Sequence, residues 1–154
     1  MTPRELAREM LDLVGHLMRT STPDFFRALS EHELTLTQVK MLHELDGRGR
    51  TLDLPDRPDC DLPLTELAAT LSLSLPAISR AIDALQERGY VERREDEHDR
   101  RMRRVRITAA GRRVLKRLME IRLNMLERFA ATLSDDERRD LAAALAPVVE
   151  RVRR

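Results

Sequence analysis

Arginines gather on one short stretch of the chain, and their spacing points to a contact with nucleic acid. The stretch reads YVERREDEHDRRMRRVRIT over residues 90–108 and holds seven arginines. Val105 and Ile107 alternate with arginines on one side of a polar tip, residues 95–102, and this period-two pattern predicts a β-hairpin with one buried face. A hairpin that carries guanidinium groups on its solvent face can reach the phosphates or the minor groove of a duplex.

Two short helices joined by a tight turn precede this hairpin. Apolar residues at helical spacing predict helices over about 66–71 and 75–88, with Ser72-Leu73 as the turn and Gly89 as the stop. In a helix-turn-helix the second helix lies in the major groove, where hydroxyl and guanidinium groups read base edges and small apolar groups meet thymine methyl groups. Two packed helices without DNA contact give the same pattern, but a hairpin directly downstream favours a winged helix. The residues at the start of the second helix that we expect to contact DNA are Ser74, Leu75, Pro76, Ala77, Ser79 and Arg80.

The remaining sequence is typical of helices that begin at polar caps. Hydrophobic residues make up 42% of the chain and aromatic residues only 3%, so Leu, Ala, Val, Ile and Met must form the core. The predicted fold class is therefore mainly α with a small β-hairpin. Phe25 and Phe26 are expected to dock into the core, and residues 46–61 to form a surface loop. The other expected helices cover about 3–19, 36–45, 109–132 and 135–152, and a short helix restarts at Thr22-Pro23-Asp24. A short strand is expected at 62–64. The expected helix caps are Thr2, Thr35, Thr65, Ser74, Thr108 and Ser134.

Charge is distributed unevenly along the chain. The formal net charge is only +1, yet residues 1–60 hold eight basic and eleven acidic residues, whereas residues 100–122 hold ten basic residues and one acid, Glu120. This concentration of positive charge makes a polyanion the expected partner. No N-terminal apolar run is typical of a signal peptide, and the weakly polar stretch 141–149 is too short to cross a bilayer. We therefore expect a soluble, cytoplasmic protein without a membrane partner.

Three segments carry the most specific patterns of the chain. They read LTLTQVKMLHEL at 34–45, LTELAATLSLSLPAISRAIDALQERGYVER at 64–93 and EDEHDRRMRRVRITAAGRRVL at 95–115. Together they resemble the multiple-antibiotic-resistance regulator (MarR) family of bacterial transcription factors. The resemblance implies one MarR-type domain over 1–154. Within it, a winged helix-turn-helix lobe covers 34–108, and residues 1–30 and 109–154 form a helical dimerisation region.

The same resemblance assigns roles in the wing to the tract around Asp99. Arg101 would enter the minor groove and Asp99 would brace it, while Asp96 and Arg100 shape the loop. A neighbouring carboxylate that holds an arginine in place reduces the rotamer entropy lost on binding. The alternative is an exposed ion pair, which contributes about 0–1 kcal/mol. Arg103, on the flank of the wing, is expected to contact phosphate.

The family resemblance further implies a homodimer and a small-molecule effector. A dimer formed by the first and the last two helices would place two recognition helices roughly 34 Å apart, on a palindromic operator in double-stranded DNA. Family members often bind small aromatic or phenolic ligands beside the DNA-binding lobe, and the ligand weakens DNA binding, as expected of a ligand-responsive repressor. Core packing is the alternative role for each candidate pocket residue. The candidates are His16, Phe25, Phe26, Met41 and His43.

Other function classes have less support in the sequence. A helical ligand-binding or partner-binding module that lacks DNA recognition remains an alternative, as does a metal-responsive or redox-responsive regulator. The only cysteine, Cys60, lies between Asp59 and Asp61, whose negative charges disfavour a reactive thiolate. None of the four histidines forms an i, i+4 pair, and no catalytic constellation or phosphate loop is present. We therefore expect no enzymatic activity, no metal site and no cofactor.

Overall fold

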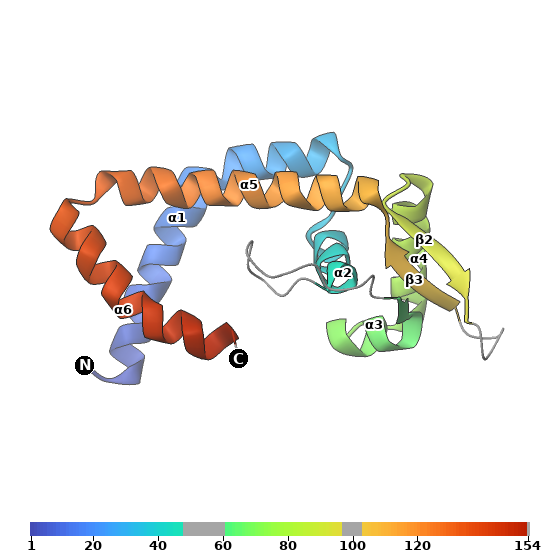
Figure 1. Cartoon of the computed structure of the whole chain (residues 1–154), viewed down its shortest axis with the longest axis horizontal. Helices are drawn as coiled ribbons and strands as arrows, with labels where there is room; N and C mark the ends of the chain where they lie inside the picture. The colour runs from blue at the N-terminus through green and yellow to red at the C-terminus, as the bar shows by residue number, and fades with distance from the viewer. Residues whose placement is uncertain (48–60, 97–102, 154) are drawn as a thin grey trace. The chain divides into compact units, whose positions relative to one another are not determined.

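The computed structural model of the chain describes residues 1–47, 61–96 and 103–153, and most of these are helical (Figure 1). The chain divides into two compact units, one formed by Met1–Ala28 with Leu118–Arg154 and the other by Leu29–Arg117. The elements in chain order are α1 (Pro3–Glu31), α2 (Leu36–Asp46), β1 (Leu62–Pro63), α3 (Leu64–Leu71), α4 (Leu75–Glu87), β2 (Val91–Glu95), β3 (Arg103–Ile107), α5 (Ala109–Thr132) and α6 (Asp135–Arg153). Helices with one small antiparallel sheet confirm the predicted fold class.

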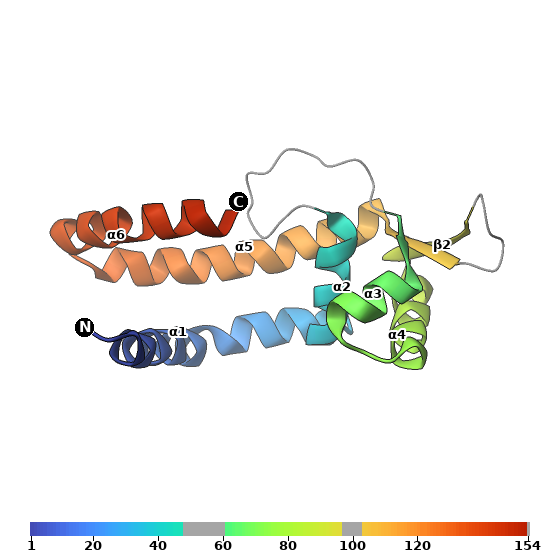
Figure 2. The ribbon, with the colours of Figure 1, turned by 90° about the horizontal axis from the view of Figure 1, so that it is seen from below.

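The unit Leu29–Arg117 carries the predicted helix-turn-helix and hairpin. Helices α2, α3 and α4 contact an antiparallel sheet with the strand order β1-β3-β2, and Figure 2 shows α3 and α4 side by side. Val91 pairs with Ile107, and Leu62 pairs with Val105. The predicted hairpin is therefore confirmed, and β1 adds a third strand to it. The fully buried side chains of this unit are Met41, Leu42, Leu45, Leu67, Ile78, Ile82, Leu85, Val91 and Val105.

Most of the predicted helix caps are confirmed. Thr35 and Gln38 form a capping box, because the Thr35 hydroxyl accepts from the Gln38 amide (3.2 Å) and the Gln38 side chain accepts from the Thr35 amide (2.9 Å). Thr2 and Glu5 exchange the same two bonds at the start of α1. These bonds satisfy amide groups that have no partner within the helix, which fixes where each helix begins.

Three local predictions are wrong. The sequence predicts a break before Pro23, but α1 is continuous. The burial of Ala28 and Leu29 stabilises the second half of the helix, and this outweighs the loss of the backbone hydrogen bond that proline removes. Phe26 does not dock into the core of its own chain: it is 51% exposed, because the helical turn that buries Ala28 and Leu29 points Phe26 outward. Thr65 does not cap α3. The helix begins at Leu64, directly after strand β1, so Thr65 lies within its first turn.

The unit formed by Met1–Ala28 and Leu118–Arg154 is built from α1, α5 and α6. Its helices carry many apolar side chains that the chain itself does not cover. On α1 these are Leu6, Met10, Leu11, Leu13, Val14 and Met18, and on α6 they are Leu141, Leu145, Val148, Val149 and Val152. Within the described ranges, no helix is both long and apolar enough to span a membrane.

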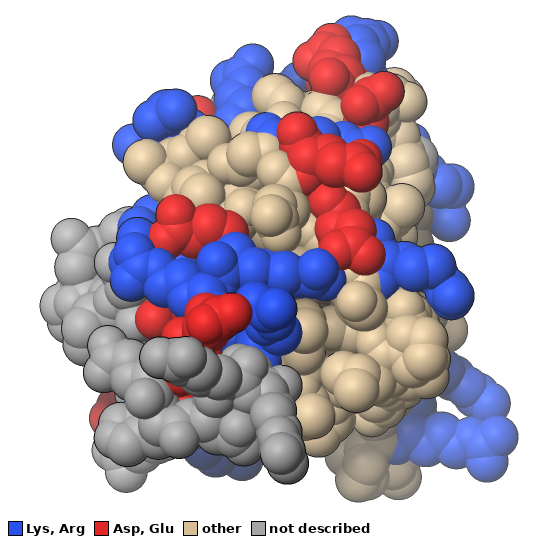
Figure 3. Space-filling view, turned by 90° about the vertical axis from the view of Figure 1, so that its right-hand side faces the viewer, with Lys and Arg blue, Asp and Glu red and all other residues tan. Residues whose placement is uncertain are grey.

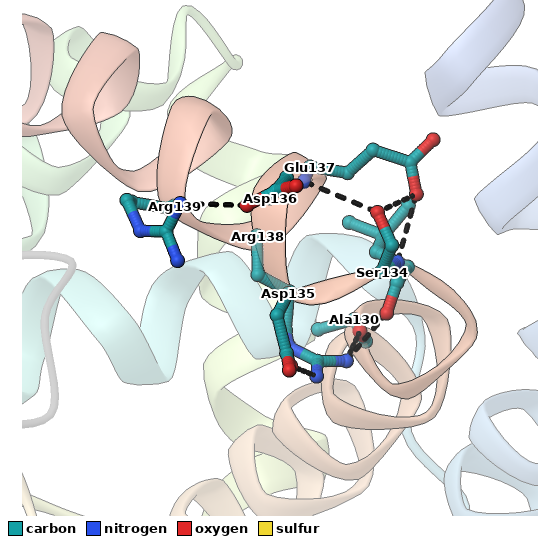
Figure 4. Close-up of polar contacts among 8 residues, drawn as sticks. Ala130, Ser134, Asp135, Asp136, Glu137, Arg138 and Arg139 are labelled. Carbon is teal, nitrogen blue, oxygen red and sulfur yellow. Dashed lines mark hydrogen bonds and ion pairs between the residues drawn. The ribbon is translucent and has the colours of Figure 1, made fainter.

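The first turn of α6 shows how its charged sequence fixes a helix start (Figure 4). The Ser134 amide donates to the Glu137 carboxylate (2.8 Å), and the Glu137 amide donates to the Ser134 hydroxyl (3.3 Å). Hydrogen bonds from the Ser134 backbone and side chain lower the pKa of Glu137, and Thr2 lowers the pKa of Glu5 in the same way. The predicted capping box at 134–137 is therefore confirmed, and its carboxylate is favoured in the charged form.

The predicted loop over residues 46–61 falls almost entirely outside the described residues. Its first residue, Asp46, is the last residue of α2, and Gly47 closes that helix with a left-handed backbone (φ 62°). A positive φ is adopted by glycine at little cost, which explains why α2 ends there.

Candidate nucleic-acid interface

The turn between α3 and α4 has the geometry that a helix-turn-helix requires. Ser72 adopts a left-handed conformation (φ 53°, ψ 42°), and the Leu73 amide returns to the Ala68 carbonyl (3.0 Å). The chain therefore reverses within two residues before Ser74 begins α4, with the Ser74 hydroxyl accepting from the Ala77 amide (3.4 Å). The predicted turn and the predicted Ser74 cap are both confirmed.

Helix α4 is held by one face and presents the other to solvent. Ile78, Ile82 and Leu85 are completely buried, so the orientation of the helix about its axis is fixed. The six residues expected to contact DNA from the second helix lie in α4 or at its cap. Of these, Ser74, Leu75, Pro76 and Arg80 are exposed, whereas Ala77 and Ser79 are half-buried. The structure thus brings the six residues that are predicted to contact the major groove together at the start of one helix.

Two of the wing's described arginines lie opposite acidic residues. Glu92 lies opposite Arg106 and Glu95 lies opposite Arg103 in the β2–β3 register. The Arg106 guanidinium donates to the Glu92 carboxylate, which also accepts from Arg94 (3.1 Å), and Arg103 pairs with Glu95 (3.3 Å). The arginines are therefore not an unbroken cationic face, as Figure 3 also shows by its adjoining blue and red side chains.

Arg103 is nevertheless available to a phosphate. Its side chain is 54% exposed, and its Glu95 partner is 58% exposed. Exposed ion pairs contribute only about 0–1 kcal/mol, so a phosphate can replace the carboxylate at little cost. The predicted role of Arg103 in contacting phosphate stays a prediction that this geometry allows.

The tip end of the wing's two strands is held by a second group of polar contacts. The Arg104 guanidinium pairs with the Asp96 carboxylate (3.0 Å) and donates to the Asp61 carbonyl. Asp96 is only 12% exposed, so this pair ties the end of β2 to β3 in a partly dry environment. Asp99, Arg100 and Arg101, the predicted wing tip, lie outside the described residues, and their roles stay predictions.

Arg93 is the site residue that sequence reasoning missed. Its Nη1 atom pairs with the Asp83 carboxylate (2.6 Å), and its Nη2 atom donates to both the carbonyl and the hydroxyl of Ser79 (3.2 Å each). A strand of the wing thus holds the exposed helix of the helix-turn-helix through a side chain that is 25% exposed. The alternation of side chains along a strand could have indicated this contact. Arg93 is two residues after the buried Val91 and therefore lies on the same face of β2.

The start of α5 is fastened to the base of the wing. The Thr108 amide and hydroxyl donate to the carbonyls of Tyr90 (3.0 Å) and Gly89 (2.6 Å), and the Thr108 hydroxyl accepts from the Gly111 amide (3.1 Å). A Cβ atom added to Gly111 would lie 2.2 Å from the Tyr90 carbonyl oxygen. The T-x-x-G sequence at 108–111 is therefore explained by a cap and by a close approach that only glycine permits.

The candidate effector residues are divided between the two units. In one unit, His16 lies against Phe129 and Phe25 against Phe26, with ring centroids 6.1 Å apart in each pair. Arg122 also lies over the Phe25 ring (4.8 Å), which is a cation–π contact. In the other unit Met41 is completely buried and His43 is half-buried on α2. Their assignment to an effector pocket stays a prediction. No cluster of three potential metal ligands occurs among the residues that the structure describes.

The sequence and the fold both match known proteins. Residues 32–102 match the family model of the MarR family. The chain is 30% identical over 88 residues to the transcriptional repressor MprA of Escherichia coli (strain K12), a match that spans 57% of this chain and only about half the length of MprA.

Three solved structures show the same fold over nearly their whole length. RV1404 from Mycobacterium tuberculosis has a TM-score of 0.74 and 21% identity, covering 97% of this chain and 94% of RV1404. YusO from Bacillus subtilis has a TM-score of 0.72 and 17% identity, covering 97% of this chain and 99% of YusO. S. aureus MepR, solved as a complex with DNA, has a TM-score of 0.65 and 19% identity, covering 94% of this chain and 98% of MepR. The helix-turn-helix and the described strands of the wing lie within or directly beside the matched segment, so the chain is similar to the MarR family over residues 32–102.

Proposed function

We propose that the chain is a sequence-specific DNA-binding regulator, a repressor, that acts as a homodimer on a palindromic operator. The observation that carries the proposal is the solvent face of α4, with Ser79 and Arg80 on its first two turns, beside an arginine-bearing wing in the same compact unit. The description of MprA as a repressor and the capture of MepR with DNA support it.

In this proposal each part of the winged unit has a separate task. Helix α4 enters the major groove, where Arg80 pairs with guanine or phosphate and the apolar group Leu75, Pro76 and Ala77 meets thymine methyl groups. Arg101 enters the minor groove with Asp99 as its brace and Arg100 beside it. Arg103 contacts a phosphate. Helix α4 thus supplies sequence preference, and the flank of the wing supplies affinity that depends on salt.

The exposed apolar faces of α1 and α6 support a homodimer. Leu145 is 49% exposed, Val148 45% and Met10 58%, and large apolar surfaces that are left in water often mark an interface. A second copy of the same face would cover it, with residues 1–30 and 109–154 as the dimerisation region. Dimerisation also supplies the two recognition helices that a palindrome needs.

A small aromatic or phenolic effector completes the proposal. The exposed Phe26 and the half-buried Phe25 offer ring surface to such a ligand, and His16 and His43 offer polar atoms. The fifth candidate residue, Met41, is completely buried. A ligand that binds the DNA-incompetent arrangement more tightly would release the operator by shifting the population. The regulator would act in the cytoplasm, where bacterial DNA is found.

Selection of duplexes from a random pool tests the proposed function. The purified chain should enrich an inverted repeat whose half-site centres lie about one helical turn apart. The enriched duplex should bind at least about a thousandfold more tightly than a scrambled duplex at physiological salt. A pool that shows no enrichment after several rounds, although the protein is folded, would contradict the proposal.

A further inference from the structure

We infer that Arg93 is a positioning residue that sets the DNA-reading face of α4 and cancels a negative charge on it. The inference rests on the proposed function, because it concerns how the same helix reads DNA. Arg93 comes from β2, whereas its contacts, Ser79 and Asp83, lie one turn apart on α4. The side chain therefore joins wing and helix at the solvent face, in addition to the apolar contacts beneath them.

The two arms of the Arg93 guanidinium act on different groups. Nη2 donates to the Ser79 hydroxyl (3.2 Å), so that hydroxyl oxygen acts as an acceptor within the protein. The hydroxyl proton is then left to be donated outward, and the acceptors that it can meet on DNA are phosphate oxygens and the major-groove atoms of guanine, adenine N7 or thymine O4. Arg93 thereby selects the hydrogen-bonding role of Ser79.

Nη1 of Arg93 neutralises a charge that would oppose DNA. Asp83 is 51% exposed and follows Arg80 by three residues and Ser79 by four, so the three side chains lie on the same side of α4. An isolated carboxylate there would repel the phosphates that flank the major groove. Arg93 lies 2.6 Å from that carboxylate, and its planar fork reaches Asp83 and Ser79 at the same time. A lysine ammonium is a single point charge and cannot reproduce that geometry.

Substitution of Arg93 should therefore change sequence discrimination more than general affinity. For Arg93→Gln, the ratio of operator to scrambled-duplex affinity should fall about tenfold or more, as expected when a charged hydrogen bond is lost. Arg93→Lys should fold and should lose part of that ratio. Adding Asp83→Asn to Arg93→Gln should restore much of the operator affinity, because the uncompensated carboxylate is then removed.

Arg94→Gln is the matched control, since it removes the same charge from the adjacent residue of β2. Arg94 is 50% exposed and pairs with Glu92 instead of with α4. It should lower affinity for both duplexes equally and leave the ratio unchanged. Equal ratios in wild type, Arg93→Gln and Arg93→Lys would overturn the inference, as would equal losses in Arg93→Gln and Arg94→Gln. Failure of the wild-type chain to bind any duplex would instead reject the proposed function, so the two failures are distinguishable.

Discussion

The side chain of Gly111 is a single hydrogen, and its surroundings leave no room for a larger one. Gly111→Ala would put a carbon 2.2 Å from the Tyr90 carbonyl oxygen and 2.8 Å from an Ile107 side-chain carbon. We expect the substitution to destabilise the fold by about 1–3 kcal/mol, the usual cost of overpacking, although alanine is otherwise the better helix former. Urea denaturation followed by circular dichroism measures the change.

Gly15→Ala is the control for this prediction. It makes the same change inside α1, where the nearest atom to the added carbon is the flexible end of Arg19 (3.3 Å). This substitution should be neutral or stabilising by up to about 1 kcal/mol. If both variants were stabilised alike, the tight junction between α5 and the wing would not exist as described.

At the wing tip the prediction concerns affinity and not stability. Arg101→Ala should weaken operator binding by about 1–3 kcal/mol, because the guanidinium proposed to enter the minor groove is lost, and should leave the proposed dimer and the fold intact. Gel-shift titration measures the affinity, and thermal melting checks the fold. Arg101 lies outside the described residues, so an unchanged affinity would refute the wing assignment without affecting the described fold.

Single residues also show what a sequence can and cannot predict. The place of the six candidate residues in α4 or at its cap was predicted because a cap and a 3.6-residue period define where a helix begins and which side is exposed. The contacts of Arg93 were not predicted, because its ion pair with Asp83 joins residues ten positions apart on different elements. The pair depends on how strand β2 crosses helix α4. The pairing of Arg103 and Arg106 with acids likewise depends on strand register, which alternation alone does not fix.

Among the elements, helix α6 offers a test by pH. Hydrogen bonds from Ser134 lower the pKa of Glu137 in the folded chain. A lowered pKa means that the charged carboxylate stabilises the fold at neutral pH, and that this contribution is lost as pH falls from the ordinary glutamate range through the lower folded value. Glu137→Gln should therefore be less stable than wild type at neutral pH.

The difference between Glu137→Gln and wild type should be smaller at about pH 3 than at neutral pH, because the glutamate of the unfolded chain is mostly protonated there. Urea denaturation at the two pH values measures it. The control is Glu150→Gln, which changes the same residue type near the other end of the same helix. A difference that persists unchanged in acid would contradict the assignment of the stabilisation to the ionised cap.

The elements themselves were largely predictable because their signals are local. Caps such as Thr35 and Ser134, and the alternation at 103–107, each act within a few residues. The break predicted before Pro23 and the cap predicted at Thr65 were wrong, because packing of Ala28 and Leu29 and the strand β1 override those local signals.

At the scale of the whole molecule, the exposed apolar face of α6 predicts an assembly. Leu145 is 49% exposed, so Leu145→Glu should leave the folded chain intact while placing a charge in the proposed dimer contact. Sedimentation velocity should show a dimer for wild type and a monomer for the variant. Operator affinity should fall with it, since a monomer loses the advantage of two linked half-site contacts.

Arg139→Glu serves as the control for the dimer prediction. Its side chain is 72% exposed and lies on the polar side of α6, so the variant should remain dimeric. A wild-type chain that is monomeric at micromolar concentration, or a Leu145→Glu variant that remains a dimer, would contradict the proposed interface.

The spacing of the two half-sites is the sharpest test of the proposed dimer on DNA, because a dimer with α4 of each copy in the major groove must meet both half-sites on one side of the duplex. The measurement compares binding to the selected operator with binding to the same duplex lengthened by about five base pairs, half a helical turn, between its half-sites. The lengthened duplex should bind no better than a scrambled one. Equal affinity for the operator and the lengthened duplex would contradict it.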